Sequence, residues 1–157
     1  MDIIELGGGS SPVYHPNFDI IKASGVDYVC DVAKGILIPD DSVDLIYSRD
    51  FIEHITFLDF LSLLRECRRV LRCKGQIEFV TADVYKAITT HSEFNLHVSN
   101  VLIGNWETPE MRHKMWYTPE LVRYILEHEK WWNIIISEYK KDSDYWKEPK
   151  MLIRAQV

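Results

Sequence analysis

The stretch from residue 43 to residue 81 places one helical pattern between two strand-like runs. Val43–Tyr47 and Gln76–Thr81 are nearly continuous apolar runs, as expected for strands that are buried on both faces. Between them, FIEHITFLDFLSLLRECRRVL repeats apolar residues at helical spacing, and Lys74-Gly75 ends the pattern. A strand, a helix and a strand in this order imply a right-handed crossover and a parallel sheet. The sequence therefore predicts an α/β fold.

The flanking segments extend this pattern. Ile3–Leu6 and Val26–Asp31 also read as strands, and YTPELVRYILEHEK reads as a helix with Thr118 as its N-cap and Pro119 in its first turn. WNIIISEY and KMLIRAQV read as two further strands that pair antiparallel, because only a polar loop joins them. The 157 residues are expected to form one domain, in which residues 85–117 are an irregular lid or insertion on the acceptor side.

Composition and charge exclude several classes of protein. A formal net charge of -6 argues against a surface that follows nucleic-acid phosphates. No apolar stretch approaches the roughly 20 residues that span a bilayer, so no membrane contact is expected. The N-terminus lacks the pattern of an export signal, which favours a cytoplasmic location. The three cysteines match no metal-ligand spacing and are expected to pack as small hydrophobes.

Glycines and carboxylates follow several of the expected strands. In MDIIELGGGSSP, three glycines directly follow the first apolar run, where the absence of a Cβ lets a ligand approach the backbone. A tight turn is the alternative reading of these glycines. Asp19 and Asp31 lie further along, and the carboxyl ends of parallel strands converge on one crevice. Because a carboxylate accepts hydrogen bonds from both hydroxyls of a ribose, a nucleoside-containing ligand explains these positions together.

These residues resemble a known family. The segments ELGGGSSP, NFDII, VCDVAKGILIPDDSVDLIYSRDFIEHI, LLRECRRVLRCKGQIEFVTAD and YTPELVRYIL, in this order, are similar to the class I S-adenosylmethionine-dependent methyltransferases. The chain most resembles short members found among genes for glycan and surface-polysaccharide modification. The resemblance implies a Rossmann-like methyltransferase fold, S-adenosylmethionine as cofactor and S-adenosylhomocysteine as product.

The resemblance also implies roles for single residues. The first glycine motif would admit the methionine part of the cofactor, an acidic residue in it would help to hold the ammonium group, and later positions would bind ribose, adenine and the region of the sulfonium. The glycines of this motif match Gly7, Gly8 and Gly9, and its acidic residue matches Glu5. The ribose position matches Asp19, the adenine position matches Asp31 with Val32, and the position near the sulfonium matches Ser48. The stretch from Gly9 to Asp19 is short for a helix plus a strand, so an abbreviated first helix and a cofactor pocket open on one side are expected.

The segment DFIEH contains the catalytic candidates. His54 is the leading candidate for a general base, because imidazole titrates near neutral pH, and Asp50 is the second candidate. In the alternative reading, His54 caps or packs the helix. If a helix begins here, Asp50, Glu53 and His54 share one face. No metal is expected, but these three residues with His113 form an alternative divalent-metal site. Similar DxxEH or ExxEH patterns occur in plant-type small-RNA 2′-O-methyltransferases and in some ubiquinone-pathway O-methyltransferases.

The segment before the last helix is rich in aromatic residues and histidines. Tyr85, His113, Trp116 and Tyr117 are expected to close over the acceptor, since aromatic faces stack on sugar or apolar rings. Covering the sheet and the core is the alternative role for each of them.

The leading hypothesis is methylation of a hydroxyl on a sugar or other small molecule. Two alternatives remain open at this point: a binding domain that has kept the fold and lost turnover, and a metal-assisted RNA 2′-O-methyltransferase. A small-molecule or glycan acceptor is the expected partner, nucleic acid is not, and association with further copies of the chain is left open.

Overall fold

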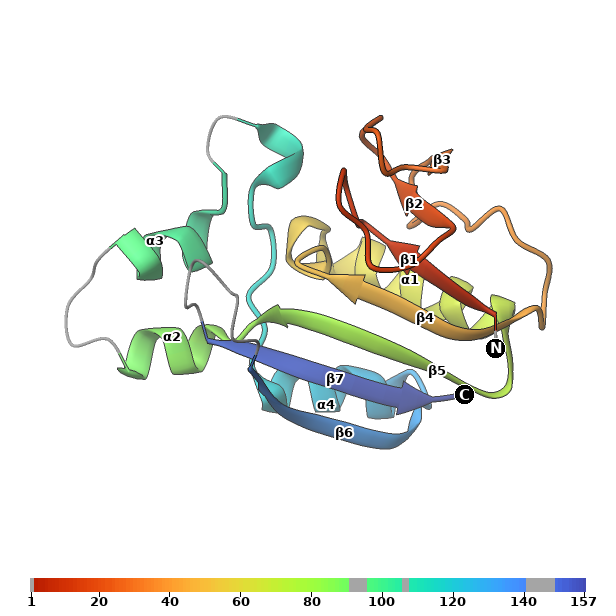
Figure 1. The fold of residues 1–157 in the computed structure, drawn as a ribbon. Coiled ribbons are helices and arrows are strands. Elements are labelled where there is room, and N and C mark those ends of the chain that lie inside the picture. The colour runs from red at the N-terminus through yellow and green to blue at the C-terminus, as the bar shows by residue number, and fades with distance from the viewer. Residues whose placement is uncertain (1, 91–95, 106–107, 141–148) are drawn as a thin grey trace.

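One mixed sheet runs through the computed structural model, which describes residues 2–90, 96–105, 108–140 and 149–157 (Figure 1). The sheet has seven strands in the order β3-β2-β1-β4-β5-β7-β6. The strands are β1 (Ile3–Leu6), β2 (Asn17–Asp19), β3 (Tyr28–Val29), β4 (Val43–Arg49), β5 (Leu71–Ala82), β6 (Trp132–Tyr139) and β7 (Lys150–Gln156). β1 to β5 pair in parallel, and β7 is antiparallel to both β5 and β6. The predicted parallel sheet with an antiparallel C-terminal hairpin is confirmed.

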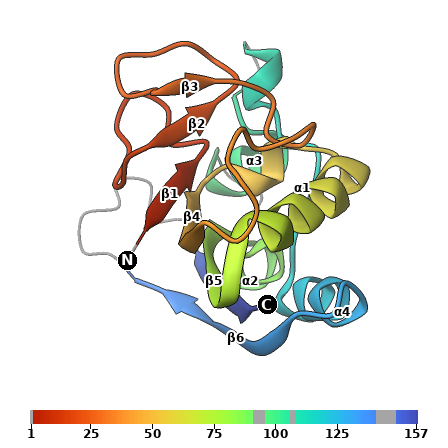
Figure 2. The same cartoon turned by 90° about the vertical axis from the view of Figure 1, so that its right-hand side faces the viewer.

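Two longer helices cover one face of this sheet. They are α1 (Phe57–Val70) and α4 (Pro119–His128), and Figure 2 shows both on the same side. Thr56 Oγ1 caps α1 by accepting a hydrogen bond of 3.2 Å from Asp59 N, and Thr118 Oγ1 caps α4 in the same way with Leu121 N at 3.2 Å. The predicted start of α4 is therefore confirmed. No helix of the described residues covers the opposite face of the central strands (Figure 2).

The alternation of side chains along the strands explains this two-layer arrangement. Ile4, Ile46 and Ile77 lie at the same level of neighbouring strands and pack with α1 in the main core. The residues that follow them in the strands point to the opposite face of the sheet and are polar. On that face, Arg154 donates a hydrogen bond of 2.8 Å to Glu78 Oε2. Removing a buried core side chain of α1, such as Leu64, should cost about 2–5 kcal/mol.

Three sequence expectations about local structure are wrong. The segment between β1 and β2, residues 7–16, is an irregular loop, so the abbreviated first helix is absent. The segment DFIEH does not begin α1: it contains a 3₁₀ turn, η1 (Ile52–His54), and the helix starts after the cap at Thr56. Residues 85–117 are not wholly irregular, because they include most of α2 (Val84–Thr90), together with α3 (Leu96–Ile103) and the 3₁₀ turn η2 (Pro109–Met111).

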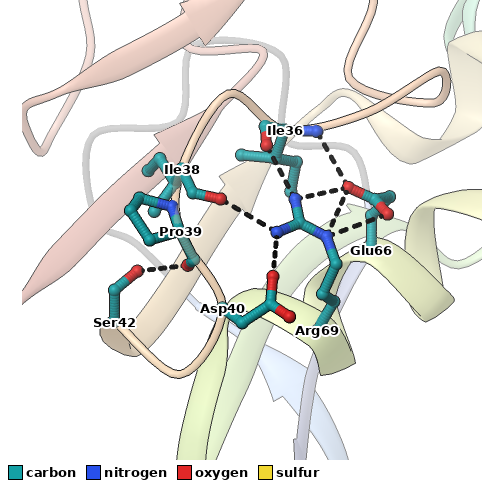
Figure 3. Close-up of polar contacts among 7 residues, drawn as sticks. All are labelled: Ile36, Ile38, Pro39, Asp40, Ser42, Glu66 and Arg69. Atoms are coloured by element: carbon teal, nitrogen blue, oxygen red, sulfur yellow. Dashed lines mark hydrogen bonds and ion pairs between the residues drawn. The ribbon is translucent and has the colours of Figure 1, made fainter.

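The side chain of Arg69 makes several of the contacts that attach the connection between β3 and β4 to α1. Arg69 donates hydrogen bonds to the carbonyl oxygens of Ile36 at 2.8 Å and Ile38 at 2.9 Å (Figure 3). The same guanidinium pairs with Glu66 at 2.8 Å and with Asp40 at 2.6 Å. Glu66 in turn accepts from Ile36 N at 3.1 Å. This network holds residues 31–42 against the helix without a helix of their own.

No helix in the described parts of the chain is long and apolar enough to cross a membrane.

Candidate functional site

A cavity of about 490 Å³ opens beyond the carboxyl ends of the parallel strands. This volume lies within the roughly 300–1,000 Å³ of small-molecule and cofactor sites. Residues from the loop after β1, from β2 and the loop after it, from the segment after β3, from the end of β4 and the loop after it, and from the η2 region border the cavity. The lining residues are Gly7, Gly8, Gly9, Ser10, Ser11, Phe18, Asp19, Ile20, Ile21, Ala23, Cys30, Asp31, Val32, Arg49, Asp50, Phe51, His54, Ile55, Glu110, Met111 and Lys114.

The glycine loop forms one end of the cavity. Gly7 and Gly9 have φ angles of 72° and 55°, which glycine adopts without the strain that a Cβ would add. A Cβ on Gly7 would overlap the ring of Phe51, whereas a Cβ on Gly9 would have no atom within 4 Å. The backbone of Gly9 therefore borders open space, where a ligand can approach it closely.

Asp19 lies beside this loop, at the end of β2. Its Oδ2 accepts a hydrogen bond of 3.0 Å from Gly9 N, and its Oδ1 accepts one of 2.8 Å from Ile21 N. Each carboxylate oxygen can accept a further hydrogen bond. The carboxylate is thus fixed by the backbone and still able to bind the two hydroxyls of a ribose.

Asp31 and Val32 border the same cavity after β3. Asp31 Oδ1 accepts from Ala33 N at 3.2 Å, and its Oδ2 pairs with Lys34 Nζ at 2.9 Å. The apolar side chain of Val32 is buried beside it. An apolar surface next to a carboxylate suits an adenine ring and its amino group. The structure thus brings Asp19, Asp31 and Val32 to the same cavity, as the resemblance implied.

Glu5 is not among the described residues that line the cavity. Its Oε2 accepts hydrogen bonds from Val13 N at 2.6 Å and from Tyr14 N at 2.7 Å. Burial raises the pKa of Glu5, while these two backbone donors act in the opposite direction. The carboxylate thus fixes the loop after the glycines, and its expected role at the ammonium group stays a prediction.

Ser48 is also outside the described lining. It is 1% exposed and lies between Leu6 and Phe79 in the register of the sheet, on the face that α1 covers. Its Oγ has no hydrogen-bond partner among the described residues. The expected position of Ser48 at the sulfonium is not supported, because the chain meets the cavity after Ser48, at Arg49, Asp50 and Phe51.

Asp50 and His54 both border the cavity, although not from one helical face. Asp50 has a positive φ of 54°, and its Oδ2 lies 3.0 Å from Nζ of the largely buried Lys150. His54 lies at the end of η1 and points its ring toward His113, with ring centroids 4.8 Å apart in an edge-on arrangement. The catalytic candidates are thus at the site, but Asp50 faces a lysine and His54 faces a second histidine.

Glu53, His54 and His113 form a compact group. A carboxylate oxygen of Glu53 and one ring nitrogen of each histidine lie within 4.8 Å of one another. Burial, and then the nearby Asp50, raise the pKa of Glu53 to about 8. Burial, and then His113, lower the pKa of His54 to about 4, and burial also lowers the pKa of His113. Three of the four residues of the alternative metal site therefore converge, and Asp50 is outside the group.

The other expected acceptor-side residues are not among the described residues that line the cavity. Tyr85 is 64% exposed, and Trp116 Nε1 donates a hydrogen bond of 2.9 Å to Leu102 O. Tyr117 is 1% exposed and its hydroxyl lies 3.3 Å from Ile52 O, so it packs in the core. Of the four residues, only His113 lies beside a catalytic candidate, through its contact with His54. The alternative reading, coverage of the core, is right for Tyr117.

Sequence reasoning missed several residues of the cavity. Arg49 and Phe51 flank the identified Asp50, and the signal for them was the end of a buried strand. Glu110, Met111 and Lys114 come from the η2 region, which no spacing in the sequence connects to the glycine loop.

Comparisons with known proteins agree with this geometry. Residues 15–79 match the family model of a methyltransferase domain. No curated protein matches the chain in sequence. A methyltransferase from Archaeoglobus fulgidus, described as S-adenosylmethionine-dependent, superposes with a TM-score of 0.69 at 14% identity, covering 99% of this chain and 86% of that one.

Two further structures have the same fold. A protein from Methanosarcina mazei with the same description has a TM-score of 0.68 at 16% identity, over 99% of this chain and 91% of that one. Phosphoethanolamine N-methyltransferase 2 of Haemonchus contortus, in complex with S-adenosylmethionine, has a TM-score of 0.67 at 12% identity. That match covers 99% of this chain and 48% of the other, so this chain spans about half of that enzyme's length.

The cavity fits the cofactor of these proteins. Gly9 leaves open space for a ligand beside the backbone, and Asp19 keeps the acceptor capacity that a ribose needs. With the strand order 3-2-1-4-5-7-6, the superpositions show that the chain has the fold of these methyltransferases, and residues 15–79 are similar to a methyltransferase domain.

Proposed function

We propose that the chain transfers a methyl group from S-adenosylmethionine to a hydroxyl of a sugar or another small molecule. One observation carries this proposal: the ring of His54 borders the same cavity as the glycine loop and Asp19. The acceptor would then lie between His54 and the part of the cavity that the glycine loop and Asp19 form.

The cofactor would lie along the glycine loop, with Asp19 at its ribose and Asp31 with Val32 at its adenine. When bound, it supplies an electrophilic methyl group on a sulfonium. The chain's own task is to align the acceptor oxygen with that methyl group and to exclude water. The apolar side chains of Phe51, Ile55 and Met111 suit the second task at the acceptor end.

The charge state of His54 supports a hydroxyl acceptor. Because its pKa is lowered to about 4, the ring is neutral at neutral pH. Its Nδ1 lies 3.3 Å from Arg112 O, a contact that only a protonated Nδ1 can make as a donor. The lone pair is then on Nε2, which can accept the proton that a hydroxyl loses when it is methylated.

The proposal includes a cytoplasmic setting and a neutral or glycan-linked acceptor. The net charge of -6 supports a small-molecule or glycan acceptor over an RNA strand. Glycan modification follows from the sequence resemblance alone.

Two measurements test the proposal. Calorimetry with S-adenosylmethionine and S-adenosylhomocysteine should give saturable binding of one ligand per chain. The chain is then incubated with methyl-labelled cofactor and a panel of sugars, phenols and, as the competing class, primary amines. Labelled methyl ethers that disappear in His54→Ala support the proposal. Binding without transfer to any hydroxyl favours the degenerate binding domain, and label on amines alone contradicts O-methylation.

A further inference from the structure

Two imidazoles and a carboxylate meet next to the cavity, which His54 borders, and their arrangement goes beyond what a proton acceptor needs. They come from two distant segments: Glu53 and His54 from η1, and His113 from the irregular segment after η2. The three ligand atoms lie within 4.8 Å of one another. Each ligand atom of a bound metal ion lies about 2.0–2.2 Å from the ion. These three atoms would need to move only slightly closer together to share one ion.

Both histidines are oriented by backbone carbonyls. His113 Nδ1 lies 2.6 Å from Val101 O, and His54 Nδ1 lies 3.3 Å from Arg112 O. Since a carbonyl only accepts, both Nδ1 atoms carry the hydrogen and both Nε2 atoms offer a lone pair. Metal-ligating histidines show this outer contact almost without exception, because it fixes the tautomer and the orientation of the ring.

The carboxylate of Glu53 provides an independent observation. Glu53 is 3% exposed, and its Oε2 has no hydrogen-bond partner among the described residues. A buried carboxylate oxygen without a partner is costly unless a cation pairs with it. Lys150 is the nearby cation, but its Nζ lies 3.0 Å from Asp50 Oδ2. A metal ion between Glu53 and the histidines would satisfy the unpartnered oxygen.

We propose that Glu53, His54 and His113 bind one divalent first-row transition cation, such as Zn²⁺ or Co²⁺, with open coordination positions toward the cavity. Two imidazoles and one carboxylate suit these cations better than Mg²⁺ or Ca²⁺, which prefer oxygen ligands.

A metal ion at this position would also restrict which acceptors can be methylated, and this step rests on the proposed function. An open position on the cation suits an oxygen ligand, so a hydroxyl or a vicinal diol is favoured over an amine. In the metal-bound chain His54 would be a ligand and would no longer be the proton acceptor described above; the cation would instead favour loss of the hydroxyl proton to solvent.

The binding test uses the full chain without a histidine tag, after treatment with a chelator. Co²⁺ is titrated while its visible absorption is followed, and Zn²⁺ is titrated by calorimetry. We expect one ion per chain, and at least 10-fold weaker binding in His113→Ala and in His54→Ala. His128→Ala is the matched control, because His128 is exposed on α4 and contacts only its own helix among the described residues. It should bind as the unsubstituted chain does.

Absence of binding below 1 mM, or equal binding by His113→Ala, would overturn the proposal. Circular dichroism of each variant separates loss of ligands from loss of fold, and Glu53→Gln gives a third variant of nearly the same shape. Calorimetry with S-adenosylhomocysteine is repeated with and without the chelator. Cofactor binding without metal binding contradicts only this inference, whereas metal binding without cofactor binding contradicts only the proposed function.

Discussion

The backbone N–H of Gly9 donates a hydrogen bond of 3.0 Å to Asp19 Oδ2. This contact joins the loop after β1 to the end of β2, where no helix connects the two strands. The residue that is placed to bind the ribose therefore also fixes the glycine that borders the open end of the cavity. Two variants should separate these functions.

Asp19→Asn should weaken binding of S-adenosylhomocysteine by about 10- to 100-fold, because hydrogen bonds to a charged acceptor contribute about 1.5–3 kcal/mol. The single amide oxygen can keep one of the two hydrogen bonds from Gly9 N and Ile21 N, so stability should fall by about 1 kcal/mol, less than the loss of binding free energy. Calorimetry measures the affinity and urea unfolding the stability. Asp41→Asn is the control, since Asp41 is exposed and its φ of 50° suits asparagine. Similar affinity in both variants would contradict the assignment of Asp19.

Gly9→Ala should bind the cofactor more weakly at a cost in stability of about 1 kcal/mol, the strain of a positive φ in alanine. Its methyl group would project into open space beside the cavity. Gly7→Ala should lose more stability, about 2–4 kcal/mol, because overlap with Phe51 adds to the same strain. Thermal unfolding with and without ligand distinguishes the two. If Gly7→Ala and Gly9→Ala lost the same stability, the open space beside Gly9 would not reduce the cost of adding a methyl group there.

The sequence predicted the sheet well, and it also predicted that Asp19 and Asp31 lie at one cavity, for a physical reason. Buried parallel strands give continuous apolar runs, and their carboxyl ends converge, so Asp19 and Asp31 could be placed together from their positions after strand-like segments. Glu5 and Ser48 could not be placed in this way. A side chain at the end of a strand can point into the cavity or into the interior of the protein. Its direction depends on which face of the sheet it occupies, and the geometry of the following loop decides this only in the folded chain.

Glu53→Gln should change how stability depends on pH. The pKa of Glu53 is raised to about 8 from the ordinary 4.5, so the folded chain holds a proton that the unfolded chain has released between these values. The free energy of unfolding should therefore fall as pH rises through this window, by at most about 1.4 kcal/mol per pH unit. His54, whose pKa is about 4, has the opposite effect below pH 6.5, so the window from 6.5 to 8 isolates Glu53.

Urea unfolding in the presence of a chelator, at steps of pH between 6.5 and 8, measures this dependence. The slope should be present in the unsubstituted chain and in Glu127→Gln, a control at an exposed position of α4. It should be reduced in Glu53→Gln. Parallel curves for all three proteins would mean that Glu53 is ionised in the folded chain throughout the window.

Arg69→Lys should lower the free energy of unfolding by about 1–3 kcal/mol, because an ammonium group cannot reproduce the planar fork that contacts Ile36 O and Ile38 O. Affinity for S-adenosylhomocysteine should also fall, since the same segment carries Asp31 and Val32. Arg65→Lys is the matched control on α1, where the exposed pair with Glu129 at 3.3 Å should contribute less than about 1 kcal/mol. Unfolding curves that coincide for the two variants would contradict this role of Arg69.

The acceptor side was harder to predict. The three-and-four spacing of Asp50, Glu53 and His54 suggested one helical face, but the chain forms a 3₁₀ turn there and Thr56 caps the helix after it. His113 reaches the site from a distant segment, and no periodicity reports such a contact. Tyr117 looked suited to stacking on an acceptor, whereas the core between α1 and η1 takes up its ring.

The attachment made by Arg69 has a consequence for how such chains can diverge. Its guanidinium contacts main-chain oxygens of residues 36 and 38, and every amino acid carries such an oxygen. Substitutions of the side chains at these two positions therefore leave this anchor chemically unchanged. Natural selection can vary the composition of the segment that follows Asp31 and Val32, provided that the arginine and the path of the backbone persist.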